Sequence, residues 1–300
     1  MVILIPTIFI LSLFFTFLFR KVGKRYKIYD LATDDLLKIH KESIPCLGGS
    51  SIILATSVAL LFSSDYRLFN IAIAGFLIFL LGFIDDLSWR DKFKIKRLYK
   101  FLFLVLFSLL VSIILLSVGI KIEFFPVIAW LMTFACIFVL INAVNYQDGT
   151  DGLAGGLVSI SLIGFIVLSI SGNNSLGLAL SVGSLLAVLG FLVFNFPPAK
   201  IFMGDSGSYY LGFVLAVLVM IFSKSYDFYN ILGLMFLLGI PLFDGVFTNI
   251  RRIVNKKSIF LGDREHFYDR MLKKGLSIRK TVLLSYLLQT IFILIGLSIY

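Results

Sequence analysis

The sequence contains few of the residues on which soluble enzymes and metal proteins depend: 2 cysteines, 2 histidines and only 15% charged residues in 300. The cysteines, Cys46 and Cys136, form no CxxC pair, which argues against a disulfide framework and a cysteine metal site. With so few histidines, the Gly-Asp-Ser-Gly stretch at 204–207 is not read as part of a serine-protease triad. Soluble domains carry about a quarter charged residues, so most of this chain is not built for water.

Apolar residues are abundant instead, at 59% of the chain with a mean hydropathy of +1.02. Burying so much apolar surface requires the bilayer as solvent. Ten apolar runs each approach the ~20 residues that cross a bilayer as a helix. The runs are 2–19, 46–63, 68–84, 98–118, 124–143, 157–171, 176–194, 207–223, 229–250 and 280–299. The sequence therefore predicts an all-α polytopic membrane protein with about ten transmembrane helices in a single domain, residues 1–300.

Lysine and arginine are nearly absent from one of the two sets of loops between these runs. The other set, with the adjoining helix ends, holds 24 of the 27 basic residues, in loops 20–45, 85–97, 144–156, 195–206 and 251–279. By the positive-inside rule these five loops are cytoplasmic and both termini are external. The formal net charge of +10 is thus attributed to orientation and to anionic lipid or phosphorylated substrates, and nucleic acid is not expected as a partner.

Two runs have special features. The first run precedes its basic cluster, unlike a cleaved signal peptide, so we expect it to be a retained helix. The run at 229–250 contains Gly239-Ile240-Pro241 and then Asp244, a carboxylate inside an apolar segment. Proline removes a helical hydrogen bond and intramembrane backbone is interrupted only with compensation. This run is predicted to be kinked or broken.

Two adjacent carboxylates, Asp85 and Asp86, follow the run at 68–84. Negative charge at the C-terminus of a helix opposes the macrodipole, and carboxylates at the membrane edge are costly and usually functional. The alternative is a solvated pair at the interface. Lys94 and Lys96 come next and are candidates for binding phosphate or lipid headgroups.

The loop at 144–156 has no basic residue and alternates amide or acidic side chains with glycine. Its candidates Asn145, Asp148 and Asp151 suit a rigid turn that recognises a base or a sugar. A calcium loop is disfavoured because the closing glutamate is missing at the required spacing. A plain turn is the alternative.

The loop at 195–206 begins with Asn195 and ends where Gly-Asp-Ser-Gly-Ser opens the next helix. The N–H groups and dipole of a helix N-terminus attract phosphate, and Asp205 could hold a hard cation beside it. A simple helix cap by Asp205 or Ser206 is the alternative. In the last loop Arg264 and His266 are candidates for binding phosphate, or they belong to an amphipathic helix at the headgroups.

In this order the segments resemble the polyprenyl-phosphate N-acetylhexosamine-1-phosphate transferases, glycosyltransferase family 4, the family of MraY and WecA. The resemblance covers almost the whole chain, from HKESIPCLGG to HFYDRML. It is carried by GFIDD (82–86), NAVNYQDGTDGLAGG (142–156), FNFPPAKIFMGDSGS (194–208), PLFD (241–244) and DREHFYDRML (263–272).

The resemblance implies ten or eleven helices in the cytoplasmic (inner) membrane and an active site on its cytoplasmic face. The implied reaction transfers a sugar 1-phosphate from a UDP-N-acetylhexosamine to polyprenyl phosphate and releases UMP, with Mg²⁺ or Mn²⁺ as cofactor. The resemblance leaves open whether the protein forms a homodimer. The implied site residues are Asp205 and Asp148 toward the metal, Asp85 and Asp86 toward the lipid phosphate, and Asn145, Asp148, Asp151, Asn195, Lys94 or Lys96 and His266 toward the substrates. We expect Arg264 to bind phosphate oxygens beside them.

The histidine motif departs from the family pattern, because His266 is followed by Phe-Tyr-Asp-Arg and not by further histidines. This resembles the branch that initiates O-antigen and surface polysaccharide, with a 6-deoxy or ordinary N-acetylhexosamine as substrate. The peptidoglycan and teichoic-acid branches are the alternatives within the family. A membrane transporter would place its polar residues at the bilayer midplane, and a lipid-phosphate hydrolase would share these loops.

Overall fold

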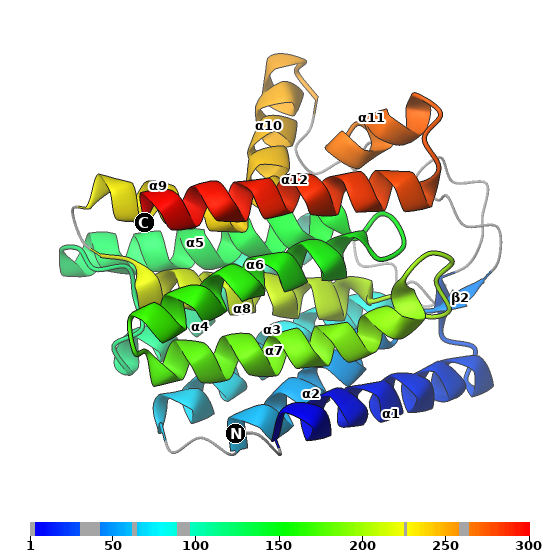
Figure 1. Cartoon of the computed structure of the whole chain (residues 1–300), viewed down its shortest axis with the longest axis horizontal. Helices are drawn as coiled ribbons and strands as arrows, with labels where there is room; N and C mark the ends of the chain where they lie inside the picture. The colour runs from blue at the N-terminus through cyan, green and yellow to red at the C-terminus, as the bar shows by residue number, and fades with distance from the viewer. Residues whose placement is uncertain (1–3, 31–42, 62–64, 89–96, 225–226, 258–263) are drawn as a thin grey trace.

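The computed structural model describes residues 4–30, 43–61, 65–88, 97–224, 227–257 and 264–300 (Figure 1). Within these ranges a two-stranded antiparallel sheet pairs β1 (Tyr29–Asp30) with β2 (Ile44–Pro45). All other regular elements are helices: α1 (Leu4–Arg25), α2 (Gly48–Leu61), α3 (Arg67–Ser88), α4 (Arg97–Ser117), α5 (Pro126–Gln147), α6 (Leu153–Ser171), α7 (Ser175–Asn195), α8 (Gly204–Phe222), α9 (Phe228–Leu238), α10 (Ile240–Val254), α11 (Phe267–Lys273) and α12 (Ile278–Ile299).

The predicted all-α polytopic membrane fold is confirmed. In the described part of the chain, eight helices are long and apolar enough to cross a bilayer, namely α1, α3, α4, α5, α6, α7, α8 and α12. The bent pair α9–α10 makes a ninth if it counts as one span. The run predicted at 46–63 corresponds to α2, a shorter apolar helix. Each of the ten predicted runs therefore coincides with a helix or with the bent pair.

The centre of the bundle is α8, which packs against α2, α3 and α5. Of its most apolar stretch 78% is buried, against 22% for α1 and 28% for both α4 and α12. Apolar side chains line α8 on all sides, as is typical of a helix with no exposed face. The outer helices leave theirs exposed, which suits contact with lipid.

The predicted break in the run at 229–250 is confirmed at Gly239, where α9 ends and α10 begins with a bend of 91°. Gly239 has φ +53°, a left-handed conformation that favours glycine. The N–H of Ile240, which has no helical partner there, donates to Oε1 of the buried Gln289 at 2.8 Å. Figure 1 shows α10 standing at a right angle to the other helices. One half of this segment thus leaves the direction of the bundle.

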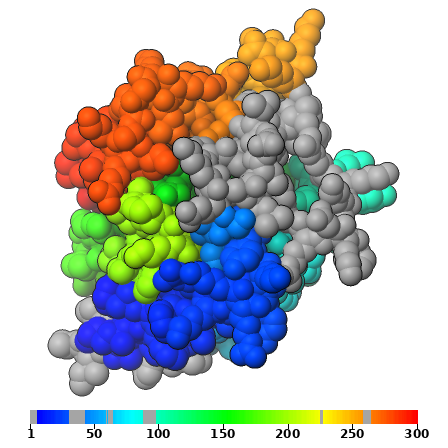
Figure 2. All heavy atoms as spheres, turned by 90° about the vertical axis from the view of Figure 1, so that its right-hand side faces the viewer, coloured from blue at the N-terminus to red at the C-terminus, as the bar shows by residue number. Residues whose placement is uncertain are grey.

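Segments far apart in sequence meet at the right-hand end of the bundle in Figure 1, which faces the viewer in Figure 2. The end of α1, the turn that follows α7 and the helix α11 lie on this one face. The two marked chain ends lie away from it. The described parts of three loops predicted to share one side of the membrane therefore lie at one end of the fold.

Candidate active site

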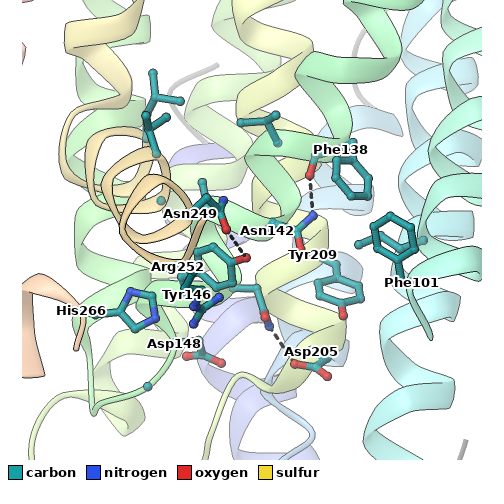
Figure 3. Close-up of a pocket in the computed structure, with 18 of the residues that line it drawn as sticks. Phe101, Phe138, Asn142, Tyr146, Asp148, Asp205, Tyr209, Asn249, Arg252 and His266 are labelled. Carbon is teal, nitrogen blue, oxygen red and sulfur yellow. Dashed lines mark hydrogen bonds between the residues drawn. The ribbon is translucent and has the colours of Figure 1, made fainter. Parts of the chain in front are cut away.

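A cavity of about 780 Å³ lies between α4, α5, α8, α10 and the segment that precedes α11. Its two ends differ in chemistry, as Figure 3 shows, with Asp148 and Asp205 at one end and Phe138 at the other. The polar end is lined by Lys100, Asn145, Tyr146, Asp148, Asp205, Arg252, Arg264 and His266. The apolar end is lined by Phe101, Leu104, Phe138, Val139, Leu242, Val246, Ile250 and Ile253.

The N-terminus of α8 is built around Asp86. Its carboxylate accepts the backbone N–H of Asp205 at 2.7 Å and that of Ser206 at 3.1 Å. These N–H groups have no partner within α8, so the carboxylate from α3 satisfies them and faces the positive end of the helix dipole. Gly204 (φ +75°) makes room, since a Cβ there would lie 2.6 Å from Oδ2 of Asp86. Asp86 thereby fixes the first turn of α8.

Asp205 itself is turned into the cavity by Asn145. The Nδ2 group of Asn145 on α5 donates to Oδ1 of Asp205 at 2.8 Å and to Oγ of Ser208 at 3.0 Å. In Figure 3 a dashed line marks a hydrogen bond to Asp205 at the polar end of the cavity. The predicted pair Asn145 and Asp205 therefore meets in space, with Asn145 orienting the carboxylate.

Asp85 behaves differently from its neighbour Asp86. It is buried at 8% exposure and forms an ion pair with Lys100 on the first turn of α4. Lys100 lines the cavity. The sequence analysis named Lys94 and Lys96, which lie outside the described residues, and missed Lys100. Lys100 could have been recognised from the sequence because it lies at the start of the apolar run that follows the acidic pair.

Asp148 caps the C-terminus of α5 and lines the polar end of the cavity. Burial raises the pKa of Asp148 well above its usual range, and the nearby charges of Asp86, Asp30 and Asp151 raise it further. A carboxyl group in such surroundings gains strongly from a neighbouring cation. This is the electrostatic behaviour expected of a metal ligand before the metal binds.

Asp151 and Asn195 hold a turn and are not among the described residues that line the cavity. Asp151 accepts the backbone N–H of Ala199 at 2.9 Å. The buried Asn195 accepts the N–H of Gly152 at 3.0 Å and donates to the carbonyl of Ile201 at 2.9 Å. Both side chains thus tie the loop after α5 to the loop after α7. The structure places them in support of the site, while their predicted contact with substrate stays a prediction.

His266 lies just before α11 with 5% exposure and lines the cavity. Its Nδ1 atom lies 2.8 Å from Oδ2 of Asp244 on α10. The imidazole packs on Tyr268, with ring planes 3° apart and centroids 5.8 Å apart, and on Tyr146 at 5.2 Å. The predicted residue is therefore present in the cavity and held from several sides.

Arg264 lies at the same end and pairs with Asp269 at 3.2 Å. Its guanidinium also lies 5.9 Å from the centre of the Tyr268 ring, and Nη1 donates to the carbonyl of Gly149 at 3.4 Å. Burial raises the pKa of Asp269, and the charge of Arg264 opposes this rise. Arg264 therefore links the α11 segment to the loop after α5.

Arg252 on α10 was not singled out from the sequence as a site residue. Among the described residues it has the largest fully buried side chain, at 2% exposure, and it lines the cavity with its guanidinium 5.4 Å from the centre of the Tyr146 ring. Figure 3 shows it between His266 and Asp205. A buried cation is costly unless anions meet it. In the sequence, Arg252 falls on the same helical stripe as Leu242, Val246 and Asn249, and this spacing could have indicated that it lines the cavity.

The donor groups allow a divalent cation at the polar end. In the part of the chain that the structure describes, no group of three or more His, Cys, Asp or Glu side chains is arranged to hold a metal. Mg²⁺, however, commonly takes one or two carboxylates and completes its shell with substrate phosphates and water. Asp148 and Asp205 line the same end of the cavity and supply such a pair.

The sequence model described as glycosyl transferase family 4 matches residues 68–223 of this chain. A probable undecaprenyl-phosphate N-acetylglucosaminyl 1-phosphate transferase of Bacillus subtilis (strain 168) is 36% identical, over 95% of this chain and 82% of that protein. An undecaprenyl-phosphate alpha-N-acetylglucosaminyl 1-phosphate transferase of Thermotoga maritima is 33% identical, over 96% and 88%. A phospho-N-acetylmuramoyl-pentapeptide-transferase of Thermotoga maritima is 34% identical, over 83% and 85%.

Proposed function

Because the chain belongs to glycosyl transferase family 4 and is a membrane enzyme that transfers a sugar phosphate to a polyprenyl phosphate, we propose that its donor is a UDP-N-acetylhexosamine and its acceptor undecaprenyl phosphate. The products would be undecaprenyl-diphosphate-sugar and UMP. N-Acetylglucosamine is the sugar that the names of the Bacillus and Thermotoga relatives give for those proteins. It is therefore the first sugar to test here.

The two-ended cavity is the observation that supports this proposal. Its polar end gathers cations and carboxylates, which suits a diphosphate, and its apolar end suits a prenyl chain. Several residues of the apolar end are also exposed on the outer surface, with Val139 at 41%, Ile250 at 52% and Ile253 at 66%. We infer that the lipid enters the cavity from the surrounding bilayer on this side.

The proposed reaction requires two anions to approach each other. A phosphate oxygen of the acceptor attacks the β-phosphorus of the donor, and the bond from that phosphorus to the bridging oxygen breaks. UMP leaves with the bridging oxygen and its electron pair. Positive groups in the cavity must screen this approach. We assign this role to four side chains of the polar end: Lys100, Arg252, Arg264 and His266.

The carboxylates are assigned separate roles. Asp205 and Asp148 would hold Mg²⁺ or Mn²⁺, which when bound would neutralise charge on the diphosphate. Asp85 would place the acceptor phosphate through its ion pair with Lys100. Asp86, whose two oxygens meet the N-terminus of α8, would position Asp205. Little proton transfer is needed, because a phosphate monoester is largely ionised at neutral pH.

The pathway and location follow from the same reasoning. UDP-sugars are soluble nucleotides, so the polar end of the cavity would face the cytoplasm from the inner membrane, in agreement with the 24 of 27 basic residues on that predicted side. The single histidine of the 263–272 segment favours initiation of a surface glycan such as O-antigen over peptidoglycan synthesis. Assembly as a homodimer remains a prediction.

Incubation of the purified protein with undecaprenyl phosphate, UDP-N-acetylglucosamine and Mg²⁺ tests the proposal. We expect UMP and a lipid-linked sugar in equal amounts, while Asp205→Asn should fold and release no UMP. Asp65→Asn is the matched control, since Asp65 pairs with Arg67 beyond the other end of α3. UDP-N-acetylgalactosamine and the 6-deoxy sugars, tested in parallel, would identify the preferred hexosamine.

Other products would overturn the proposal. Free phosphate without sugar transfer would identify a lipid-phosphate hydrolase, and no turnover with any sugar of the panel would favour a transporter. Full turnover by Asp205→Asn would remove the assigned metal role from that residue.

A further inference from the structure

Asp244 is a carboxylate at the start of α10 that meets three polar groups from different parts of the chain. Its Oδ2 atom lies 2.8 Å from Nδ1 of His266 and accepts Nε2 of Gln147 at 2.9 Å. Its Oδ1 atom accepts the backbone N–H of Phe267 at 2.9 Å. The side chain is only 10% exposed. Asp244 therefore joins the end of α5, the start of α10 and the start of α11.

The three contacts decide which ring nitrogen of His266 carries a proton. An ionised carboxylate accepts hydrogen bonds and donates none. We take Asp244 to be ionised, since its two oxygens already accept from Gln147 and Phe267 and only the ionised form can accept from the imidazole as well. The Nδ1 atom of His266 must then be the donor to Asp244. The hydroxyl of Thr248, 3.3 Å from the same Nδ1, adds a polar contact to that edge of the ring.

The opposite edge of the ring is left for the cavity. His266 lines the cavity, and its ring packs on Tyr146 and Tyr268. Figure 3 shows the imidazole turned toward Arg252 and Asp148. With Nδ1 held by Asp244, only Nε2 can exchange a proton or bind a ligand.

We propose that Asp244 is a positioning residue for the transfer reaction: it keeps the proton of His266 on Nδ1 and presents Nε2 to the substrate phosphates. The proposal rests on the proposed function where it names the ligand, and on the contacts alone where it names the tautomer. A partner that fixes the tautomer and orientation of a working histidine is a recurrent device in catalytic and metal sites.

Asp244→Asn changes the tautomer with little change in shape. Asparagine has one acceptor oxygen, and if that oxygen keeps the N–H of Phe267, its NH₂ group faces His266 and Gln147. The Nδ1 atom must then accept, and the proton moves to Nε2. Asp244→Glu keeps a carboxylate and should keep the proton on Nδ1. Asp227→Asn, at the N-cap of α9, is the matched control because it makes the same substitution at the far end of the same broken segment.

The composition of the chain makes the tautomer directly measurable. It has 2 histidines, so His40→Gln leaves His266 as the only imidazole. Protein labelled with ¹⁵N-histidine then gives one pair of ring nitrogen signals, and protonated and unprotonated nitrogens resonate far apart. We expect Nδ1–H in His40→Gln alone and with Asp227→Asn or Asp244→Glu, and a shift toward Nε2–H with Asp244→Asn.

Kinetics supply the second measurement. The loss of a partner that orients a metal-ligating histidine typically costs about 10- to 100-fold, and we apply the same range to His266. We expect Asp244→Asn to lower kcat/KM for the UDP-sugar by that factor, Asp244→Glu to recover a large part of it, and Asp227→Asn to match the parent enzyme.

Two results would overturn the proposal: an Nε2–H signal in the His40→Gln protein, or a tautomer that Asp244→Asn leaves unchanged. The labelled protein needs no substrate for this measurement. A failure of the proposed function would therefore appear as absent turnover with the tautomer still on Nδ1, whereas a failure of the present proposal would appear in the spectrum.

Discussion

Replacement of Asp86 by asparagine separates a structural role from a chemical one in the acidic pair. The two carboxylate oxygens accept the N–H groups of Asp205 and Ser206, at 2.7 Å and 3.1 Å. Asparagine can keep one of these contacts but turns an NH₂ donor toward the other N–H. Loss of an N-cap costs about 0.5–2 kcal/mol, and a backbone N–H left unpaired costs roughly 1–3 kcal/mol. Both figures describe the same lost contact, so we expect Asp86→Asn to lower the free energy of unfolding by about 1–3 kcal/mol.

Thermal unfolding of the purified protein in detergent measures this effect. Asp227→Asn is the matched control, since Asp227 caps α9 through one N–H, that of Asn230 at 3.0 Å. Asparagine caps a helix about as well as aspartate when a single acceptor is needed, so this control should unfold at the temperature of the parent. UMP release should fall for Asp86→Asn, because Asp205 loses its fixed position. An unchanged unfolding temperature for Asp86→Asn would refute the capping role.

Three further outcomes are expected. Arg252→Gln should raise the KM for polyprenyl phosphate about 10- to 150-fold, which corresponds to the ~1.5–3 kcal/mol of a charge-assisted hydrogen bond. Arg251→Gln is the control and should leave that KM unchanged, because the Arg251 side chain pairs with Glu265 at 3.1 Å. Equal effects of the two substitutions would contradict the role assigned to Arg252. Gly239→Ala should unfold at a lower temperature, because a left-handed residue costs about 1–2 kcal/mol without glycine and the new Cβ would lie 2.3 Å from the side chain of Gln289. The Mg²⁺ affinity, taken from Mg²⁺ titrations of UMP release, should weaken as the pH falls. Burial raises the pKa of Asp148, so protons compete with the metal at a higher pH than they would at an exposed carboxylate. Asp148→Asn should flatten this dependence, and an identical pH profile would exclude Asp148 as a ligand.

The sequence was sufficient for the fold because its signals are local. A run of apolar residues predicts a membrane helix wherever it falls, and the ten predicted runs all coincide with helices or with the bent pair. Gly239-Ile240-Pro241 predicted a break for a local reason as well, the missing proline N–H. What the sequence could not give was the angle of that break, which depends on the side chain of Gln289 from α12.

The site was predicted in outline but not in its division of roles. Asp85 and Asp86 are neighbours with the same chemistry, yet one pairs with Lys100 and the other meets the N-terminus of α8. Which one does which depends on the crossing of α3 and α8, and no local pattern specifies that crossing. The same holds for Asn195, whose amide meets two backbone groups of a turn where the motif suggested a substrate contact.

Arg252 shows the complementary limit. Its neighbours along the chain are Arg251 and Ile253, and a basic residue near a membrane boundary is typical of orientation signals. Only the fold reveals that Arg252 is buried against Tyr146 while Arg251 reaches Glu265. A count of basic residues cannot separate those that set the orientation of the protein from those that bind substrate, because both kinds are expected on the same side of the membrane.

The right angle between α9 and α10 has a consequence for how the two substrates meet. Because α10 leaves the direction of the bundle, the route that we propose for the lipid runs sideways, between α5 and α10, into the apolar end of the cavity. A prenyl acceptor that enters this way diffuses in two dimensions and is never extracted from the bilayer, which would cost about 0.8 kcal/mol for each CH₂ group exposed to water. The proposed donor would arrive by diffusion in three dimensions at the other end. In this arrangement the bend at Gly239 would let the lipid acceptor stay in the bilayer and the nucleotide sugar stay in water while they react.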